Sequence, residues 1–148
     1  MEQPLAEQLI HTWLRLSSVL KNNRLISTMT FNEIFICNIL YHQKISSSPL
    51  LTATEVGQKT KLLKSQMNKI ISSLEQQGLV RRIRGTDDRR KVYLEFVEEN
   101  SQAYRLEHER ILKMLDQLTQ QLGEEKLFQV IQLITEVTDV MENITTNQ

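Results

Sequence analysis

The sequence predicts a mainly α-helical fold that carries one small β-hairpin (α+β). Glycine and proline together account for only 6 of the 148 residues, and the turns of all-β proteins consume these two residue types. Apolar residues recur at helical steps of three and four along most of the chain, whereas the strand signals are confined to residues 79–96. The composition therefore argues against an all-β barrel or sandwich, and the length suits one domain.

Two helices are predicted in the N-terminal third. The first spans residues 5–20 and presents one apolar stripe, formed by Leu5, Leu9, Trp13, Leu16 and Leu20. The second follows Thr30, which forms a capping-box pattern with Glu33, and continues to about Tyr41. Apolar residues cover most of its circumference, so we expect this helix to be the buried centre of the fold.

A helix-turn-helix is predicted next. Thr52 and Glu55 repeat the capping-box pattern and open a short helix that ends near residues 60–63. A second helix runs from about Lys64 to Gln77, and Gly78 stands where a left-handed residue ends a helix. Its inward face is expected to consist of Met67, Ile70, Ile71 and Leu74.

A β-hairpin and two long helices complete the chain. Residues 79–84 and 92–96 have the composition of strands, and the polar segment 85–90 between them suits a charged hairpin tip. Helices follow over roughly residues 101–122 and from Glu124 onward, separated by Gly123. The last helix repeats its apolar residues almost as a coiled-coil seam does.

The charges are segregated, although the chain has 18 basic and 18 acidic residues. Residues 52–92 carry 10 basic and 4 acidic side chains, a net charge of +6, whereas residues 93–148 carry 4 and 11, a net charge of −7. Such asymmetry indicates a middle segment that faces a polyanion, or, in the plainer interpretation, a solvated basic face.

The helix over residues 64–77 has the polar side chains of a DNA recognition helix. The second helix of a helix-turn-helix can enter the major groove, where amides, hydroxyls and ammonium groups reach base edges and phosphates. The candidates are Lys64, Ser65, Gln66, Asn68, Lys69 and Ser72. Taken alone, this helix favours the plainer interpretation, a polar face in water, and the neighbouring hairpin is what favours DNA binding.

The hairpin tip supplies a second candidate contact. Arg89 and Arg90 have guanidinium groups that fit a narrow minor groove. Asp88, two residues before Arg90, is positioned to hold that arginine by charge-assisted hydrogen bonds. The alternative is an exposed ion pair without function. Recognition helix and basic hairpin together predict a winged helix.

These residues resemble the MarR family of bacterial winged-helix transcriptional regulators. The motifs that carry the resemblance are Glu55-Val56, Met67-Asn68-Lys69, Leu74-Glu75, Gly78-Leu79-Val80 and Asp88-Arg89-Arg90. The resemblance implies homodimers that bind pseudo-palindromic promoter DNA and usually repress, often until a small phenolic or lipophilic effector or an oxidant releases them. It also implies major-groove contacts by Asn68 and Lys69, and a minor-groove contact by Arg90, which Asp88 orients.

The sequence departs from the family pattern at two places. Leu63 stands where many members have a serine or threonine cap, so Ser65 is an alternative start of the recognition helix. Residues 96–100 replace the usual Leu-Thr-x-x-Gly after the wing.

We expect residues 30–97 to form the DNA-binding domain, and residues 1–29 and 98–148 to form a helical dimerisation region. The apolar stripes of the flanking helices exceed what one winged helix can cover, so a homodimer would bury them. Two recognition helices about 34–36 Å apart would then meet successive major grooves of double-stranded DNA, which predicts a pseudo-palindromic operator.

Other chemistry is not expected. Cys37 is the single cysteine, which excludes an intramolecular disulfide and fits a cytoplasmic protein, and its apolar neighbours indicate a buried, inert thiol. No 18-residue apolar stretch indicates a membrane span. No catalytic constellation, cofactor motif or convergent metal ligands stand out, so neither an enzyme nor a metal site is expected.

Two questions stay open. His11, Trp13 and Phe31 could border an effector pocket, although packing in the core is the favoured interpretation. The alternative function is a winged helix used as a protein-protein interaction module without specific DNA binding, which would have no need for Arg89 and Arg90 at the hairpin tip.

Overall fold

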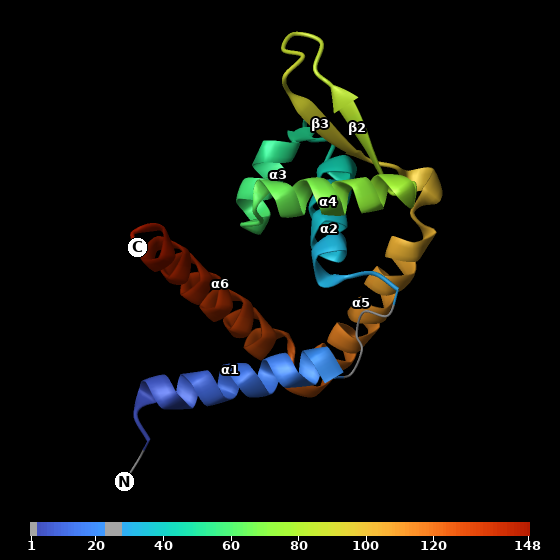
Figure 1. Ribbon diagram of the computed structural model, residues 1–148. Helices are drawn as coiled ribbons and strands as arrows, with labels where there is room; N and C mark the ends of the chain where they lie inside the picture. The colour runs from blue at the N-terminus through green and yellow to red at the C-terminus, as the bar shows by residue number, and fades with distance from the viewer. Residues whose placement is uncertain (1–2, 23–27) are drawn as a thin grey trace. The chain divides into compact units, whose positions relative to one another are not determined.

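The computed structural model describes residues 3–22 and 28–148, which belong to two units, residues 1–108 and 109–148 (Figure 1). The predicted fold class is confirmed, because helices dominate and the strands form one small antiparallel sheet. In chain order the elements are α1 (Leu5–Asn22), α2 (Phe31–Ile45), β1 (Leu51–Thr52), α3 (Ala53–Thr60), α4 (Lys64–Gln76), β2 (Val80–Arg84), β3 (Val92–Phe96), the 3-10 turn η1 (Glu98–Asn100), α5 (Gln102–Leu122) and α6 (Glu124–Thr146).

Both predicted capping boxes are present at the starts of α2 and α3. The Thr30 hydroxyl accepts from the Glu33 amide at 3.2 Å, and the Glu33 carboxylate accepts from the Thr30 amide at 2.9 Å. Thr52 and Glu55 repeat the arrangement at 3.1 and 2.9 Å. These reciprocal bonds satisfy amides that the first helical turn leaves unpaired, so the two helices begin where the sequence predicts. α2 continues to Ile45, one turn beyond the expected end.

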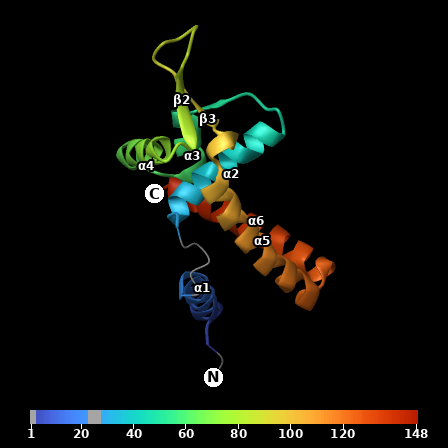
Figure 2. The same ribbon diagram turned by 90° about the vertical axis from the view of Figure 1, so that its right-hand side faces the viewer.

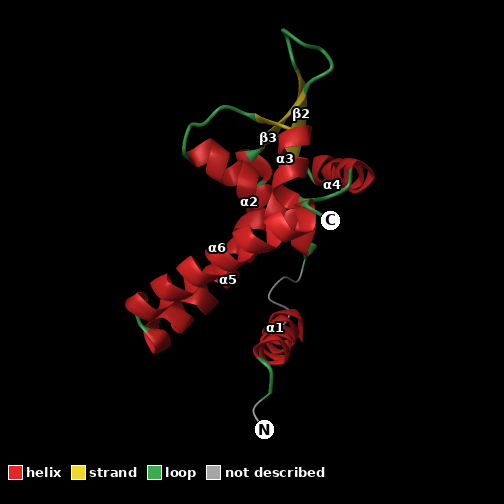
Figure 3. Ribbon diagram, turned by 90° about the vertical axis from the view of Figure 1, so that its left-hand side faces the viewer, coloured by secondary structure: helices red, strands yellow, loops and turns green. Residues whose placement is uncertain are grey.

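The sheet has three strands in the order β1-β3-β2, all antiparallel. β2 and β3 are the predicted hairpin, whose tip projects beyond the helices of its unit (Figure 2 and Figure 3). β1 was not predicted, because its two residues are too short to show an alternating pattern. Leu51 and Thr52 pair with Leu94 and Tyr93, which attaches the start of α3 to the hairpin.

The core of the first unit lies where α2, α3, α4 and the sheet meet. Its buried members include Ile36, Cys37, Leu40, Val56, Ile71, Leu74, Leu79, Leu94, Phe96 and Tyr104. The prediction that α2 is buried around most of its circumference is wrong at Phe31 and Phe35, which are 70% and 36% exposed. Tyr104 anchors the start of α5, since its ring lies 5.5 Å from that of Phe96 and its hydroxyl accepts from Asn38 at 3.2 Å.

The apolar stripes of α1 and α6 are exposed. Trp13 and Leu16 are each 54% exposed, so the expected core packing of Trp13 is wrong, and His11 is exposed as well. In the second unit, none of the described residues of α6 is buried. The apolar residues that recur along this helix, such as Ile134 and Ile144, are exposed. Among the described helices, none is both long enough and apolar enough to span a membrane.

Candidate nucleic-acid interface

α3 and α4 form the helix-turn-helix, and apolar contacts pack the two helices against each other. Val56 and Met67 are buried between them, and a Cβ atom on Gly57 would lie 3.5 Å from the Met67 Cγ atom. Lys61 adopts a left-handed conformation (φ 58°), which reverses the chain between the helices. α4 begins at Lys64, as predicted, and Gly78 (φ 74°) follows its end in the left-handed conformation expected there.

The structure exposes all six residues proposed on α4, but it places them in different surroundings. Ser65 and Lys69 lie on the side opposite the buried Met67 and Ile71. The Gln66 side-chain oxygen accepts from the Leu63 amide at 3.1 Å, so this residue caps the helix. Leu63 has no side-chain acceptor, and the predicted alternative that Ser65 starts the helix is wrong.

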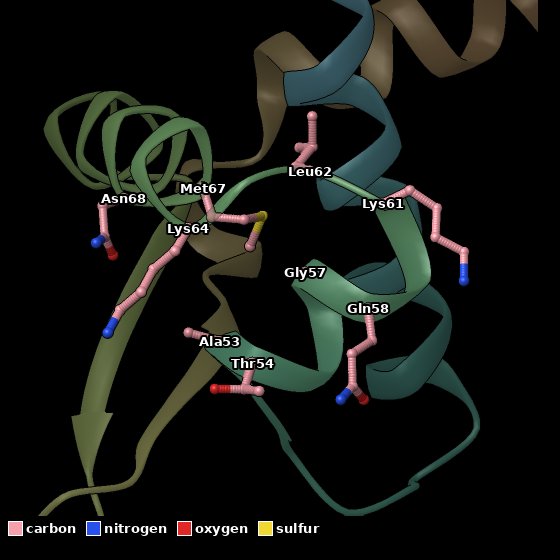
Figure 4. Close-up of a pocket in the computed structure, with 9 residues that line it drawn as sticks. All are labelled: Ala53, Thr54, Gly57, Gln58, Lys61, Leu62, Lys64, Met67 and Asn68. Carbon is pink, nitrogen blue, oxygen red and sulfur yellow. The ribbon is translucent and has the colours of Figure 1, made fainter. Parts of the chain in front are cut away.

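Lys64 and Asn68 border an open hollow of about 560 Å³ between α3 and α4 (Figure 4). Thr54 and Gln58 reach the same hollow from α3, and their polar ends point to the side toward which Lys64 and Asn68 are directed. The wing strands run toward this side as well. Thr54 and Gln58 were not among the residues proposed from the sequence, although their spacing of four residues, opposite the buried side of α3, is a usable signal.

The remaining α4 candidate, Ser72, faces the wing. Its hydroxyl lies 3.3 Å from a terminal guanidinium nitrogen of Arg82, which donates to it. Arg82 comes from β2 and had no place among the residues proposed from the sequence. Of the six residues proposed on α4, Ser72 is therefore the one whose side chain forms a hydrogen bond with another helix or strand.

The wing tip is closed by main-chain hydrogen bonds. The Gly85 amide donates to the Lys91 carbonyl at 2.9 Å, and the Lys91 amide donates to the Asp88 carbonyl at 3.1 Å. Glycine is required at position 85, because a Cβ atom there would lie 2.5 Å from the Asp88 carbonyl oxygen. The close approach keeps the tip tight and presents residues 86–90 at its end.

Asp88 holds Arg90 at the tip, as the sequence predicts. One carboxylate oxygen accepts from the Arg90 amide at 3.0 Å and from Nε at 3.2 Å, and the other accepts from Nη2 at 3.4 Å. The hydrogen bonds from the Arg90 side chain and amide lower the pKa of Asp88 below its usual value of 3.8. Arg90 is nevertheless 92% exposed, so its guanidinium is oriented and accessible together.

The wing has a second face with a different ion pair. Arg81 donates to Glu95 at 3.2 Å across the β2-β3 ladder, and its side chain is 62% exposed. Arg89 is exposed at the tip beside Arg90. Substitutions of Arg81 and of Arg89 can therefore serve as controls for substitutions of Arg90.

The thiol of Cys37 is unsuited to oxidant sensing. Burial, with a smaller contribution from the Glu33 carboxylate, raises its pKa to about 12. The thiolate that reacts with oxidants is therefore almost absent near neutral pH. Within the described ranges, no three histidine, cysteine, aspartate or glutamate side chains gather as a metal site would require.

A helix-turn-helix with an exposed polar second helix, followed by a hairpin with an oriented arginine, defines the winged-helix class of transcriptional regulators. The chain belongs to the SarA/Rot family of transcriptional regulators, whose family model matches residues 16–105. The predicted resemblance to MarR-type winged-helix regulators is thereby confirmed, and so is the expectation that the protein is not an enzyme.

One relative and two solved structures illustrate the likeness. The transcriptional regulator FarR of Neisseria gonorrhoeae is 25% identical over 96 residues, which cover 65% of this chain and 66% of FarR, just under two thirds. The regulator PcaV of Streptomyces coelicolor, solved with its natural ligand, has a TM-score of 0.70 and 22% identity over 94% of this chain and 97% of PcaV. FabT of Streptococcus pneumoniae, solved with DNA, has a TM-score of 0.67 and 20% identity, with 95% and 96% of the chains covered.

Proposed function

We propose that this regulator is a homodimer that binds a pseudo-palindromic operator in double-stranded DNA and represses transcription. The α4 residues Lys64, Ser65, Asn68 and Lys69 read or contact the major groove, while Arg90, held by Asp88, enters the adjacent minor groove beside Arg89. Thr54 and Gln58 add contacts from α3. Gln66 contributes mainly as the cap of α4.

One observation carries the proposal. The exposed start of α4 and the wing belong to one unit, and the Lys64 and Asn68 side chains are directed toward the side along which the wing strands run. A duplex lying there can meet both elements at once. The net charge of +6 over residues 52–92 supports the same assignment, because a phosphate backbone is attracted to such a segment.

A second copy of the chain accounts for the exposed apolar stripes. Leu9, Trp13, Leu16, Ile131 and Ile134 are all between 54% and 58% exposed, and apolar surface on this scale marks an interaction site in a soluble protein. The proposed dimerisation region is residues 1–29 and 98–148, and residues 30–97 form the DNA-binding domain. Identical α6 helices with a repeating apolar seam are suited to pairing across a two-fold axis.

A small-molecule effector is proposed to release the protein from DNA. PcaV and a second solved structure, NadR with 4-hydroxyphenylacetate, are ligand-bound neighbours of similar fold. They support the response of this regulator to a small molecule. The chemistry of Cys37 argues against an oxidant as that signal, since its thiol is buried and protonated.

Selection from a random duplex pool tests the proposed function. The purified full-length protein is expected to enrich inverted repeats with half-site centres about 10–10.5 base pairs apart, or a multiple of that spacing. Fluorescence anisotropy on the selected duplex is expected to give a log affinity that falls with log salt by about 0.9 per phosphate contact. Equal, micromolar-or-weaker binding to selected and scrambled duplexes would instead favour a protein-protein interaction module.

Matched wing variants locate the interface. Arg90→Ala is expected to lower affinity for the selected duplex by about 5- to 150-fold, which corresponds to the loss of about 1–3 kcal/mol for a specific contact. Arg81→Ala removes an arginine of the same hairpin that is paired with Glu95, and it is expected to have little effect. Equal losses in the two variants would show that only total charge matters.

A further inference from the structure

One arginine attaches the wing to α4. Arg82, in the middle of β2, donates from Nη1 to the Glu75 carboxylate and from Nη2 to the Ser72 hydroxyl at 3.3 Å and the Asn68 carbonyl at 3.4 Å. Residues 68, 72 and 75 lie one turn apart along one side of α4. A single planar guanidinium therefore spans two turns of the recognition helix.

The strand register explains why Arg82 faces the helix. In β2, Val80 pairs with Phe96 and Arg82 pairs with Leu94. Val80, Leu94 and Phe96 are buried in the core, and neighbours in a ladder share a face, so Arg82 lies on the inward side of the hairpin. An amphipathic strand normally carries an apolar residue at such a position. The Arg82 side chain is only 30% exposed. A half-buried guanidinium requires a partner, which Glu75 supplies.

The opposite side of α4 is held by α2. The Glu33 carboxylate accepts from the Ser73 hydroxyl at 2.9 Å and from the side-chain amide (Nε2) of Gln77 at 3.2 Å. The C-terminal half of α4 is thus attached on both sides. The N-terminal half packs against α3 through the buried Met67 and carries the exposed side chains of Lys64 and Asn68.

We propose that Arg82 is a positioning residue for DNA recognition, which sets the angle between α4 and the wing and thereby the separation of Asn68 and Arg90. The proposal rests on the proposed function. It gives Ser72 a role different from the base contact that the sequence predicts, because its hydroxyl accepts from Arg82. Glu75 is part of the same device, although it carries the charge that DNA repels.

The alternative role for Arg82 is a direct phosphate contact, and Glu75 distinguishes the two. If Arg82 binds phosphate, Glu75→Gln frees its guanidinium and removes a negative charge, so affinity rises for every duplex. If Arg82 positions α4 against the wing, Glu75→Gln loosens that attachment, and discrimination between the selected and a scrambled duplex falls. The ratio of the affinities for the two duplexes separates the roles, because it falls only if Arg82 positions α4 against the wing.

The first test uses the free protein and needs no DNA. Hydrogen exchange followed by mass spectrometry compares the wild type with Arg82→Gln, Glu75→Gln and the control Arg81→Gln, whose ion pair lies on the other face of the hairpin. Exchange over β2 and residues 68–76 is expected to rise on the order of tenfold in the first two variants and to stay unchanged in the control. Unchanged exchange in Arg82→Gln would overturn the proposal.

The second test measures discrimination by anisotropy on the selected and scrambled duplexes. Arg82→Gln and Glu75→Gln are each expected to lower the ratio of the two affinities about tenfold, with similar thermal midpoints. Arg82→Lys, which retains the charge but not the fork, is expected to lie between them and the wild type. Affinities of Glu75→Gln that rise by the same factor for both duplexes, or faster exchange with unchanged discrimination, would overturn the proposal.

The two tests separate this proposal from the proposed function. If the wild type does not discriminate between duplexes, the proposed function fails and the positioning role fails with it, even where exchange shows the attachment. If the wild type discriminates and the Arg82 and Glu75 variants discriminate equally well, only the positioning role fails.

Discussion

Asp88 and Arg90 show how two adjacent charges of opposite sign act together. The carboxylate accepts three hydrogen bonds from one arginine residue, which fixes the guanidinium while leaving it exposed. Because the folded pKa of Asp88 is lowered, any stability that the pair contributes is present above the unfolded pKa and is lost as pH falls through the folded value. Near neutral pH the carboxylate is charged and the wing arginine stays oriented.

An NMR titration of the Asp88 side-chain carboxyl carbon tests this pair. In the wild type the midpoint is expected below 3.8, because Arg90 stabilises the charged form. In Arg90→Ala the midpoint is expected to move up toward 3.8. Arg89→Ala removes the neighbouring arginine and is expected to leave the midpoint where it is; an equal shift in both variants would mean that general charge, not this contact, sets the pKa.

Sequence reasoning succeeded for Asp88 and Arg90 because they are two residues apart in one tight turn, where local geometry alone brings them together. It could not separate Gln66 and Ser72 from their neighbours on α4. Both are polar and exposed in the helical pattern, yet Gln66 accepts from the Leu63 amide and Ser72 accepts from Arg82. Each contact depends on where the chain before or after the helix lies.

At the scale of elements, α4 begins differently from α2 and α3. The other two helices have a threonine cap with its reciprocal glutamate, whereas α4 has Leu63 at the cap position and only the Gln66 half of the arrangement. Leu63 has the extended backbone of an N-cap (φ −66°, ψ 150°) and is 68% exposed. A hydroxyl at this position would meet an amide that the present side chain leaves unsatisfied.

Leu63→Ser is therefore expected to stabilise the protein by about 0.5–1 kcal/mol, since serine can accept from an amide of the first turn of α4. Urea unfolding followed by circular dichroism measures the change. Leu63→Ala is the matched control, because it removes the same exposed side chain without adding an acceptor. A serine variant no more stable than the alanine variant would contradict the predicted cap.

The helices and the hairpin were predictable because their signals are local. Capping boxes, the glycine after α4 and the alternation of β3 lie within a few residues of the boundaries they mark. β1 was missed for the opposite reason, since its two residues pair with Leu94 and Tyr93 some forty positions later. A strand defined by its partner has no signal of its own.

At the scale of the whole molecule, the exposed apolar stripes of α1, α5 and α6 are the basis of the proposed dimer. The wild type is expected to be a dimer by light scattering after size exclusion at micromolar concentration. Ile134→Glu is expected to shift it to the monomer, because a carboxylate would be buried without a partner. Asn143→Glu adds the same charge to α6 and is expected to remain dimeric.

Circular dichroism separates dissociation from unfolding in this experiment. The Ile134→Glu monomer is expected to retain the winged helix, whose core includes Ile71 and Leu94 but no residue of α6. Weaker operator binding should accompany dissociation, since one half-site contact is lost. A monomeric wild type would contradict both the dimer and the inverted-repeat operator.

The sequence by itself determined the helical class, the helix-turn-helix, the hairpin and the Asp88–Arg90 pair, because each depends on residues close in the chain. Tertiary structure decided that α4 is attached to α2 through Glu33 and to the wing through Arg82. It also decided that Trp13 and Phe31 are exposed, whereas the burial of Cys37 was already predicted from its apolar neighbours. Periodicity shows that a helix has an apolar side, but only the packed chain shows whether another element covers it.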